Sequence, residues 1–204
     1  FSLTMVLARF IAHGNGHAVP VPAAAMLLVM LVDGPAAILG TVMLSVLVAV
    51  LFNFNVSILL MQLIGGFMAI SRSSGIFQRT DLTRAGFSIG LLNMATVVLV
   101  AFLKKTTGGA ELMTDCIWAG LNGIISAIFV IGTLPYWESL FNVVTPIRLG
   151  ELANPNQALL KRLLIEAPGT YHHSLLVANM AEAAAEMIGA DPLLARVGGY
   201  YHDV

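Results

Sequence analysis

Four residues near the end of this 204-residue chain have the side chains of a metal site. His172 and His173 are adjacent, and His202 and Asp203 form a second pair one predicted helix later. Two packed helices can bring two imidazoles and one carboxylate together. This donor set favours Mn or Fe over a structural zinc ion, which prefers closed, thiolate-rich sites. A His-Asp dipeptide alone is weak evidence, because it arises often by chance, but an inward-facing histidine one helix earlier strengthens the prediction.

Short helices must position these residues. The predicted bounds of the helices are 157–166, 171–188 and 192–201. The sequence Ala167-Pro168-Gly169 ends the first helix, and Thr170 is a suitable N-cap for the second. Asp191 caps the third helix with Pro192 at its first position, so that helix carries His202 and Asp203 at its end.

The second helix has one predicted core face. Its members recur at helical spacing and are His173, Val177, Met180 and Ala184. We therefore predict that His173 points into the core and that His172 points about 100° away. Glu182 and Glu186 lie off this face and are expected to be solvated.

The composition of the whole chain predicts a membrane protein. Apolar residues make up 58% and charged residues 10%, whereas soluble domains have about half and about a quarter. The net charge is −1 and no basic stripe is present, which argues against binding a nucleic-acid polymer. The single Cys116 excludes an internal disulfide and a cysteine zinc site.

Long uncharged stretches divide the chain into membrane segments. The predicted segments are 1–12, 20–32, 35–53, 56–71, 84–103 and 113–137. The fold class is therefore all-α: a polytopic membrane helical bundle over 1–142, a linker over 143–156, and further helices over 157–204. Segment 20–32 reaches only about 20 Å as a helix. It is either a re-entrant helix or a short span buried among its neighbours.

Polar residues mark the breaks between these segments. Asp33-Gly34-Pro35 predicts a tight turn with proline at the start of the next helix. Arg9 and Asp33 lie at segment ends, where a charge reaches water. His13 and His17 flank a glycine-rich stretch that we interpret as a solvated loop, with a metal or proton role as the alternative.

The arginines indicate an orientation. Arg72, Arg79 and Arg84 make the predicted loop 72–84 positive, which places it in the cytoplasm. Two crossings follow this loop, so the C-terminal helices are expected on the cytoplasmic side as well.

Three stretches carry a resemblance to a known family. They are Glu151–Asn156 (ELANPN), Leu163–Ser174 (LLIEAPGTYHHS) and Leu193–Asp203 (LLARVGGYYHD). The last two closely resemble the beginning of the HD domain in the seven-transmembrane HD phosphodiesterases. The resemblance covers the whole chain, as spans two to seven, the linker and the first HD helices.

The resemblance implies a function and a site. Members of that family hydrolyse cyclic di-AMP and have an outer sensor domain, seven spans and a cytoplasmic HD domain in the bacterial plasma membrane. His173 would be the first metal ligand, and His202 and Asp203 the HD pair. Catalysis would be metal-assisted phosphodiester hydrolysis, with the catalytic Asp203 bridging two divalent transition metals, Mn or Fe. Val204 stands where the family usually has Ile. Substrate-binding residues are unassigned, and homo-oligomerisation is left open.

Two alternatives remain at this stage. One is a membrane signalling receptor whose HD portion binds nucleotide without hydrolysis, and the other is a transporter-like protein, which the scarcity of midplane charges disfavours. The chain looks like a fragment of a larger protein, so we expect it to be inactive alone, with His202 and Asp203 exposed. The apolar side chains expected to be accessible are Val177, Met180, Leu194 and Val197.

Overall fold

The computed structural model describes residues 15–76, 78–105 and 109–204, and within these ranges the chain contains helices and no strand. The predicted all-α fold is confirmed. The predicted segment 1–12 lies outside the described residues, as do Arg9 and His13. The chain divides into two compact units, Phe1–Val143 and Val144–Val204, and each is described by itself.

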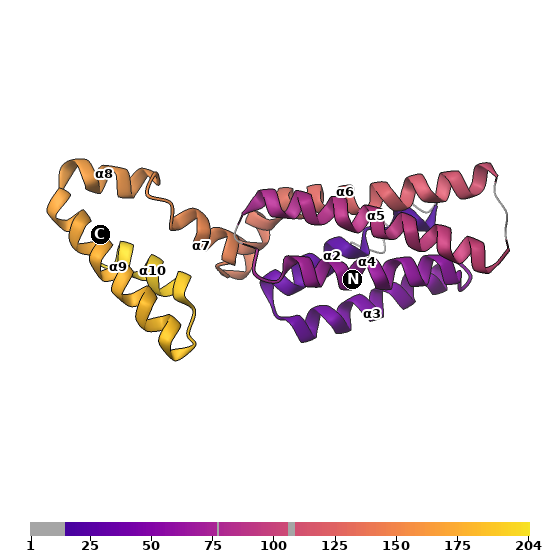
Figure 1. Ribbon diagram of the computed structural model, residues 1–204, viewed down its shortest axis with the longest axis horizontal. Coiled ribbons are helices and arrows are strands. Elements are labelled where there is room, and N and C mark those ends of the chain that lie inside the picture. The colour runs from indigo at the N-terminus through magenta and orange to yellow at the C-terminus, as the bar shows by residue number, and fades with distance from the viewer. Residues whose placement is uncertain (1–14, 77, 106–108) are drawn as a thin grey trace. The chain divides into compact units, whose positions relative to one another are not determined.

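The first unit is a helical bundle. Its described elements are the 3-10 helix η1 (Gly16–Ala18) and the helices α2 (Val21–Leu31), α3 (Gly34–Leu51), α4 (Val56–Ser73), α5 (Arg79–Leu103) and α6 (Ala110–Phe141) (Figure 1). The last four are long and apolar enough to cross a membrane. The chain is therefore a multi-pass membrane protein.

Capping groups place the turns of the bundle where the sequence predicts them. The Asp33 carboxylate accepts a hydrogen bond from the Ala36 amide at 2.8 Å and caps α3. Asn55 caps α4 in the same way, with its Oδ1 2.9 Å from the Ser57 amide nitrogen. Asn53 precedes it in the left-handed region, with φ of 55°.

The predicted charged loop over 72–84 is too long. Helix α4 continues to Ser73 and α5 already begins at Arg79, so only 74–78 connect them. A charged first turn is compatible with a helix, because the negative Asp81 interacts favourably with the positive end of the helix dipole at the N-terminus of α5. Arg84 also lies one turn after Asp81, with 3.4 Å between their charged atoms.

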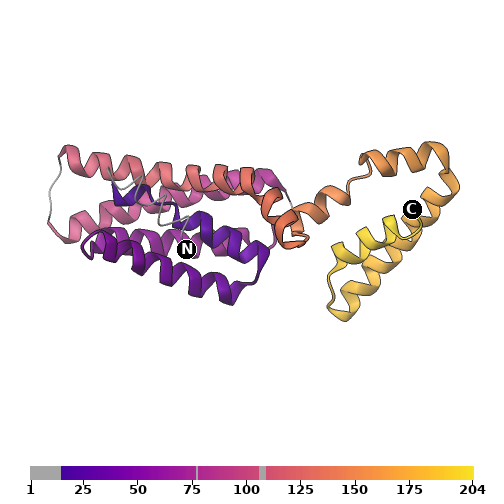
Figure 2. The same cartoon turned by 180° about the vertical axis from the view of Figure 1, so that it is seen from behind.

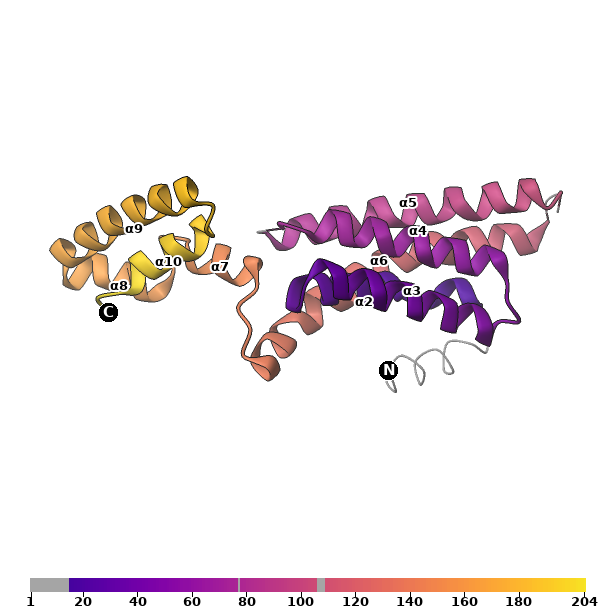
Figure 3. The ribbon, with the colours of Figure 1, turned by 90° about the horizontal axis from the view of Figure 1, so that it is seen from below.

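Small residues let α5 and α6 touch through their backbones. A Cβ atom added to Gly90 would lie 2.5 Å from the Gly120 carbonyl oxygen, and one added to Gly86 would lie 2.8 Å from that of Gly123. The two helices run side by side along the bundle (Figure 3). Small residues of this kind allow close packing of membrane helices.

The polarity of the bundle fits an apolar environment. Large apolar side chains such as Phe102 and Ile128 are exposed on its outside. The amides of Gln62, Asn93 and Asn122 are fully buried inside it. Helix α2 packs against α3, α4 and α6, so the short predicted segment 20–32 lies among neighbouring helices, although Val32 at its end is exposed.

The second unit contains four short helices. They are α7 (Pro146–Leu152), α8 (Ala158–Glu166), α9 (Pro168–Ile188) and α10 (Pro192–Tyr201) (Figures 1 and 2). Helix α7 lies in the stretch predicted as linker, and the Thr145 hydroxyl caps it by accepting a hydrogen bond from the Arg148 amide at 3.3 Å.

Two caps of this unit test the sequence predictions. Asp191 caps α10 as predicted, with its Oδ1 3.0 Å from the Leu194 amide nitrogen. The predicted Thr170 cap is wrong, because α9 begins at Pro168 and its N-cap is Ala167. A proline is well suited to the first helical position, since its φ is already fixed there and its missing N–H would have no intrahelical partner.

Candidate metal centre

A close backbone contact holds α10 against α9. Gly199 is buried against Ala178, and a Cβ atom at Gly199 would lie 2.5 Å from the Ala178 Cα and 2.7 Å from its amide nitrogen. Leu160 and Tyr200 complete the buried cluster around Ala178. Only glycine allows this approach, which brings the end of α10 beside the first half of α9.

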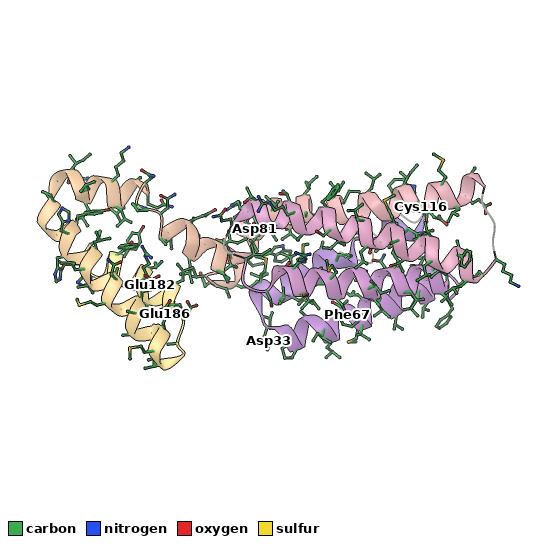
Figure 4. The ribbon with its side chains drawn as sticks, viewed as in Figure 1. Asp33, Phe67, Asp81, Cys116, Glu182 and Glu186 are labelled. Carbon is green, nitrogen blue, oxygen red and sulfur yellow. The ribbon has the colours of Figure 1, made fainter. Side chains whose placement is uncertain are left out.

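An ion pair fixes the same two helices further along. One terminal nitrogen of Arg196 lies 3.1 and 2.9 Å from the two carboxylate oxygens of Glu182, and Arg196 Nε donates to the Tyr200 hydroxyl at 3.0 Å. The hydrogen bonds to Tyr200 and Glu182 raise the pKa of Arg196. The prediction that Glu182 is solvated is wrong, whereas Glu186 is exposed as predicted; Figure 4 labels both.

Tyr201 ties α10 to α7. Its hydroxyl donates to the Leu152 carbonyl oxygen at 3.0 Å. Burial raises the pKa of Tyr201, and the nearby Arg148 charge lowers it by less. The phenol therefore keeps its proton near neutral pH and remains a donor at the C-terminus of α7.

The packing of α9 and α10 brings His173 and His202 together. Their ring centroids are 5.4 Å apart, with the planes tilted by 57°. His202 Nδ1 lies 2.8 Å from the Gly199 carbonyl oxygen. Nδ1 therefore carries the proton that makes this hydrogen bond, and the lone pair of Nε2 is free to bind a metal ion. Most metal-binding histidines have this arrangement.

The predicted orientation of His173 is wrong. His173 is exposed, and Met180 on the predicted core face is 65% exposed. The residues of α9 that are buried are Ser174, Ala178 and Ala185. The true core face is therefore turned by about one residue, or roughly 100°. Close packing selects the small side chains and leaves the larger ones outside.

The expected accessible side chains divide into two groups. Met180 and Leu194 are 65% and 54% exposed, as predicted. Val197 is only 7% exposed and Val177 is half-buried, because both lie on the side of the α9–α10 contact. His202 and Asp203 are exposed, as expected.

The described residues fit a metal ion in part. Two imidazoles are adjacent, and Asp203 follows His202 at the same end of α10. No group of three or more His, Cys, Asp or Glu side chains in the described part of the chain is arranged to hold a metal ion. His172 is also exposed and meets the Tyr171 ring edge-on at 5.9 Å. The structure thus places the His173 ring, rather than the His172 ring, beside His202.

Comparison with known proteins identifies the family. The model of a family described as "7TM receptor with intracellular HD hydrolase" matches residues 1–145. The chain belongs to this 7TM-HD family. The HD domain model matches residues 170–204, the part of the 7TM-HD chain that contains His173, His202 and Asp203.

Curated relatives agree with this assignment. The chain is 38% identical to the cyclic-di-AMP phosphodiesterase PgpH of Bacillus subtilis (strain 168), with 93% of the chain and 28% of the relative covered. It is 37% identical to PgpH of Listeria monocytogenes, with 91% and 26% covered. The chain thus spans about a quarter of the length of these 7TM-HD relatives. No solved structure matches the chain.

Proposed function

We propose that the chain provides the membrane bundle and the first HD helices of a metal-dependent phosphodiesterase that hydrolyses cyclic di-AMP. The HD helices would lie on the cytoplasmic side of the bacterial plasma membrane. The observation that carries the proposal is the pairing of the His173 and His202 rings at 5.4 Å within a sequence matched by the HD family. The curated relatives named as cyclic-di-AMP phosphodiesterases support the choice of substrate.

In this proposal His173, His202 and Asp203 would hold two divalent transition metals, Mn or Fe, with Asp203 as the catalytic carboxylate. Such ions, when bound, lower the pKa of water and shield the charge that develops on a phosphate. The protein's own contribution is positional. The Gly199 carbonyl orients His202 from one side, and the contact of Gly199 with Ala178 keeps His202 beside α9.

The histidine pair on α9 provides the test. In the full-length protein that contains this chain, we expect His173→Ala to remove bound metal and hydrolysis of cyclic di-AMP. The loss should exceed the roughly 10–100-fold that changes in outer-shell groups cause. His172→Ala is the matched control and should be much milder, because its ring contacts Tyr171 instead of His202.

Metal content by elemental analysis and hydrolysis of cyclic di-AMP are the two measurements. Equal losses in the two variants would contradict the assignment of His173. The wild-type protein could also bind cyclic di-AMP without cleaving it, even with metal added. That result would contradict the enzyme proposal and favour a nucleotide-binding receptor.

A further inference from the structure

The membrane bundle has an open cleft that the phosphodiesterase proposal does not use. It has a volume of about 650 Å³ and lies where α3 ends and where α4 and α6 begin. This is the end of the bundle opposite the 74–78 turn; Figure 4 labels Asp33 and Asp81 near that turn and Cys116 toward the cleft. In the proposed orientation the cleft therefore opens on the outer side of the membrane.

One wall of the cleft is a built polar network. Asp115 Oδ1 accepts a hydrogen bond from Asn15 Nδ2 at 2.6 Å, and His17 Nδ1 is 3.4 Å from the same oxygen and 2.7 Å from Asn15 Oδ1. His17 is only 2% exposed, so its interpretation as part of a solvated loop is wrong. The Asp115 side chain keeps 36% of its surface exposed and can still meet a ligand.

The polar network continues into the bundle core. Asn122 Nδ2 donates to the His17 and Val19 carbonyl oxygens at 3.0 and 2.7 Å, and Gln62 Nε2 donates to Val19 at 2.8 Å. Gln62 is fully buried, and its Oε1 has no hydrogen-bond partner in the described part of the chain. Gln62 does not line the cleft. Its hydrogen bonds to the Gly16 and Val19 carbonyl oxygens hold η1, and with it the polar wall, in place.

The charges and shape of the cleft define its ligand. Glu111 and Asp115 line one side, and no Lys or Arg is among the described lining residues. Phe52 and Ile58 line the other side, and the volume lies in the range typical of small-molecule sites. A metal ion does not fit, since the described residues offer no group of three metal-ligating side chains.

We propose that this cleft binds a small organic cation with a primary ammonium group and an apolar body. The ammonium lies against Asp115 and Glu111, and the apolar body packs on Phe52, whose ring face also attracts cations. Glu111 alone would be explained by the positive N-terminus of α6. Asp115 lies one turn further along and is held by Asn15, one hundred positions earlier in the chain.

The test measures binding to the full chain in detergent micelles, with 2-phenylethylammonium chloride as the probe and thermal unfolding as the readout. We expect saturable stabilisation of the wild type. Asp115→Asn and Glu111→Gln should each weaken binding at least about tenfold, since each removes a charged hydrogen-bond acceptor. Asp33→Asn is the matched control, because it removes one acidic charge outside the cleft and asparagine still caps α3.

Three comparisons can overturn the proposal. Equal stabilisation by the neutral 2-phenylethanol would mean that only an apolar site exists. If Asp33→Asn weakens probe binding as much as the cleft variants do, the binding depends on the overall charge of the protein and not on the cleft. If MgCl2 stabilises the protein through Asp115 and the ammonium probe does not, the cleft binds a metal ion and the proposed organic cation is wrong. The absence of a saturable shift up to about 10 mM probe would also refute the proposal.

Two features keep the outcome interpretable. The Glu111 side chain is exposed, so Glu111→Gln tests the cleft without disturbing the hydrogen bonds of Asp115. If both variants at Asp115 and Glu111 bind the probe like the wild type, the proposal fails. Binding is measured without turnover, so this result is independent of the proposed hydrolysis of cyclic di-AMP.

Discussion

Adjacent glycines in α10 allow the link between helix packing and the metal centre to be tested. Gly199 is buried, and an alanine there would place its Cβ 2.5 Å from the Ala178 Cα. Carbon atoms in good contact lie about 3.5–4.0 Å apart, so α9 and α10 would have to separate by about 1 Å. Gly198 is exposed and has nothing within 4 Å of a Cβ atom. Gly198→Ala is therefore the matched control.

The magnitude follows from the difference between the two variants. Both gain helix propensity, up to about 1 kcal/mol, when glycine becomes alanine. Only Gly199→Ala adds the cost of overpacking, about 1–3 kcal/mol. Local opening of α9 and α10 should therefore be about 5–150 times more frequent in Gly199→Ala than in Gly198→Ala.

Native-state hydrogen exchange of the α9 and α10 amides measures this opening, and Mn²⁺ binding measured by electron paramagnetic resonance reports on the site. The reasoning predicts faster exchange together with weaker Mn²⁺ binding for Gly199→Ala only, because His202 is three residues from the contact. Equal exchange in the two variants would refute the close contact. Faster exchange with unchanged Mn²⁺ binding would refute its role in placing His202.

Two further changes test other parts of the molecule. A double-mutant cycle on Glu182 and Arg196, which keep 29% and 35% of their side-chain surface exposed, should give a coupling free energy of about 1 kcal/mol in hydrogen exchange. The more exposed pair Arg162–Glu166 should give no more than about 0.5 kcal/mol, and equal couplings would contradict the anchoring role of Arg196. A cysteine replacing Gln78, in the short α4–α5 turn, should stay unlabelled by an impermeant thiol reagent in intact cells; labelling would reverse the proposed orientation.

Local signals predicted most of the helix bounds. The turn at Asp33, the cap at Asp191 and the end of α8 at Glu166 follow from residues that act on their immediate neighbours. Helix α7 was missed, although Thr145 followed by Pro146 is itself a helix-start signal. A helix of seven residues is too short to show a clear apolar period, so the prolines in that stretch predict a linker instead.

The polar contacts of the sites could not be predicted in the same way. Asn15 reaches Asp115 across one hundred positions, and Glu182 meets Arg196 from a different helix. Neither pair has a sequence spacing that favours contact. A histidine between glycines is typical of a solvated loop, and only the packing of helices from distant parts of the chain buries His17.

The wrong prediction for the core face of α9 comes from the size of the residues on which it rests. The spacing of the larger apolar residues predicts one face of α9, yet the helices approach through Ala178 and Gly199. A glycine inside a helix costs up to about 1 kcal/mol relative to alanine. Helix α10 contains two adjacent glycines, of which Gly199 packs against Ala178 and Gly198 is exposed. His202 lies three residues after Gly199 and hence on the same side of the chain's helical path. The contact made by Gly199, and not by Gly198, therefore sets which side of α10 faces α9, and with it the side on which His202 meets His173.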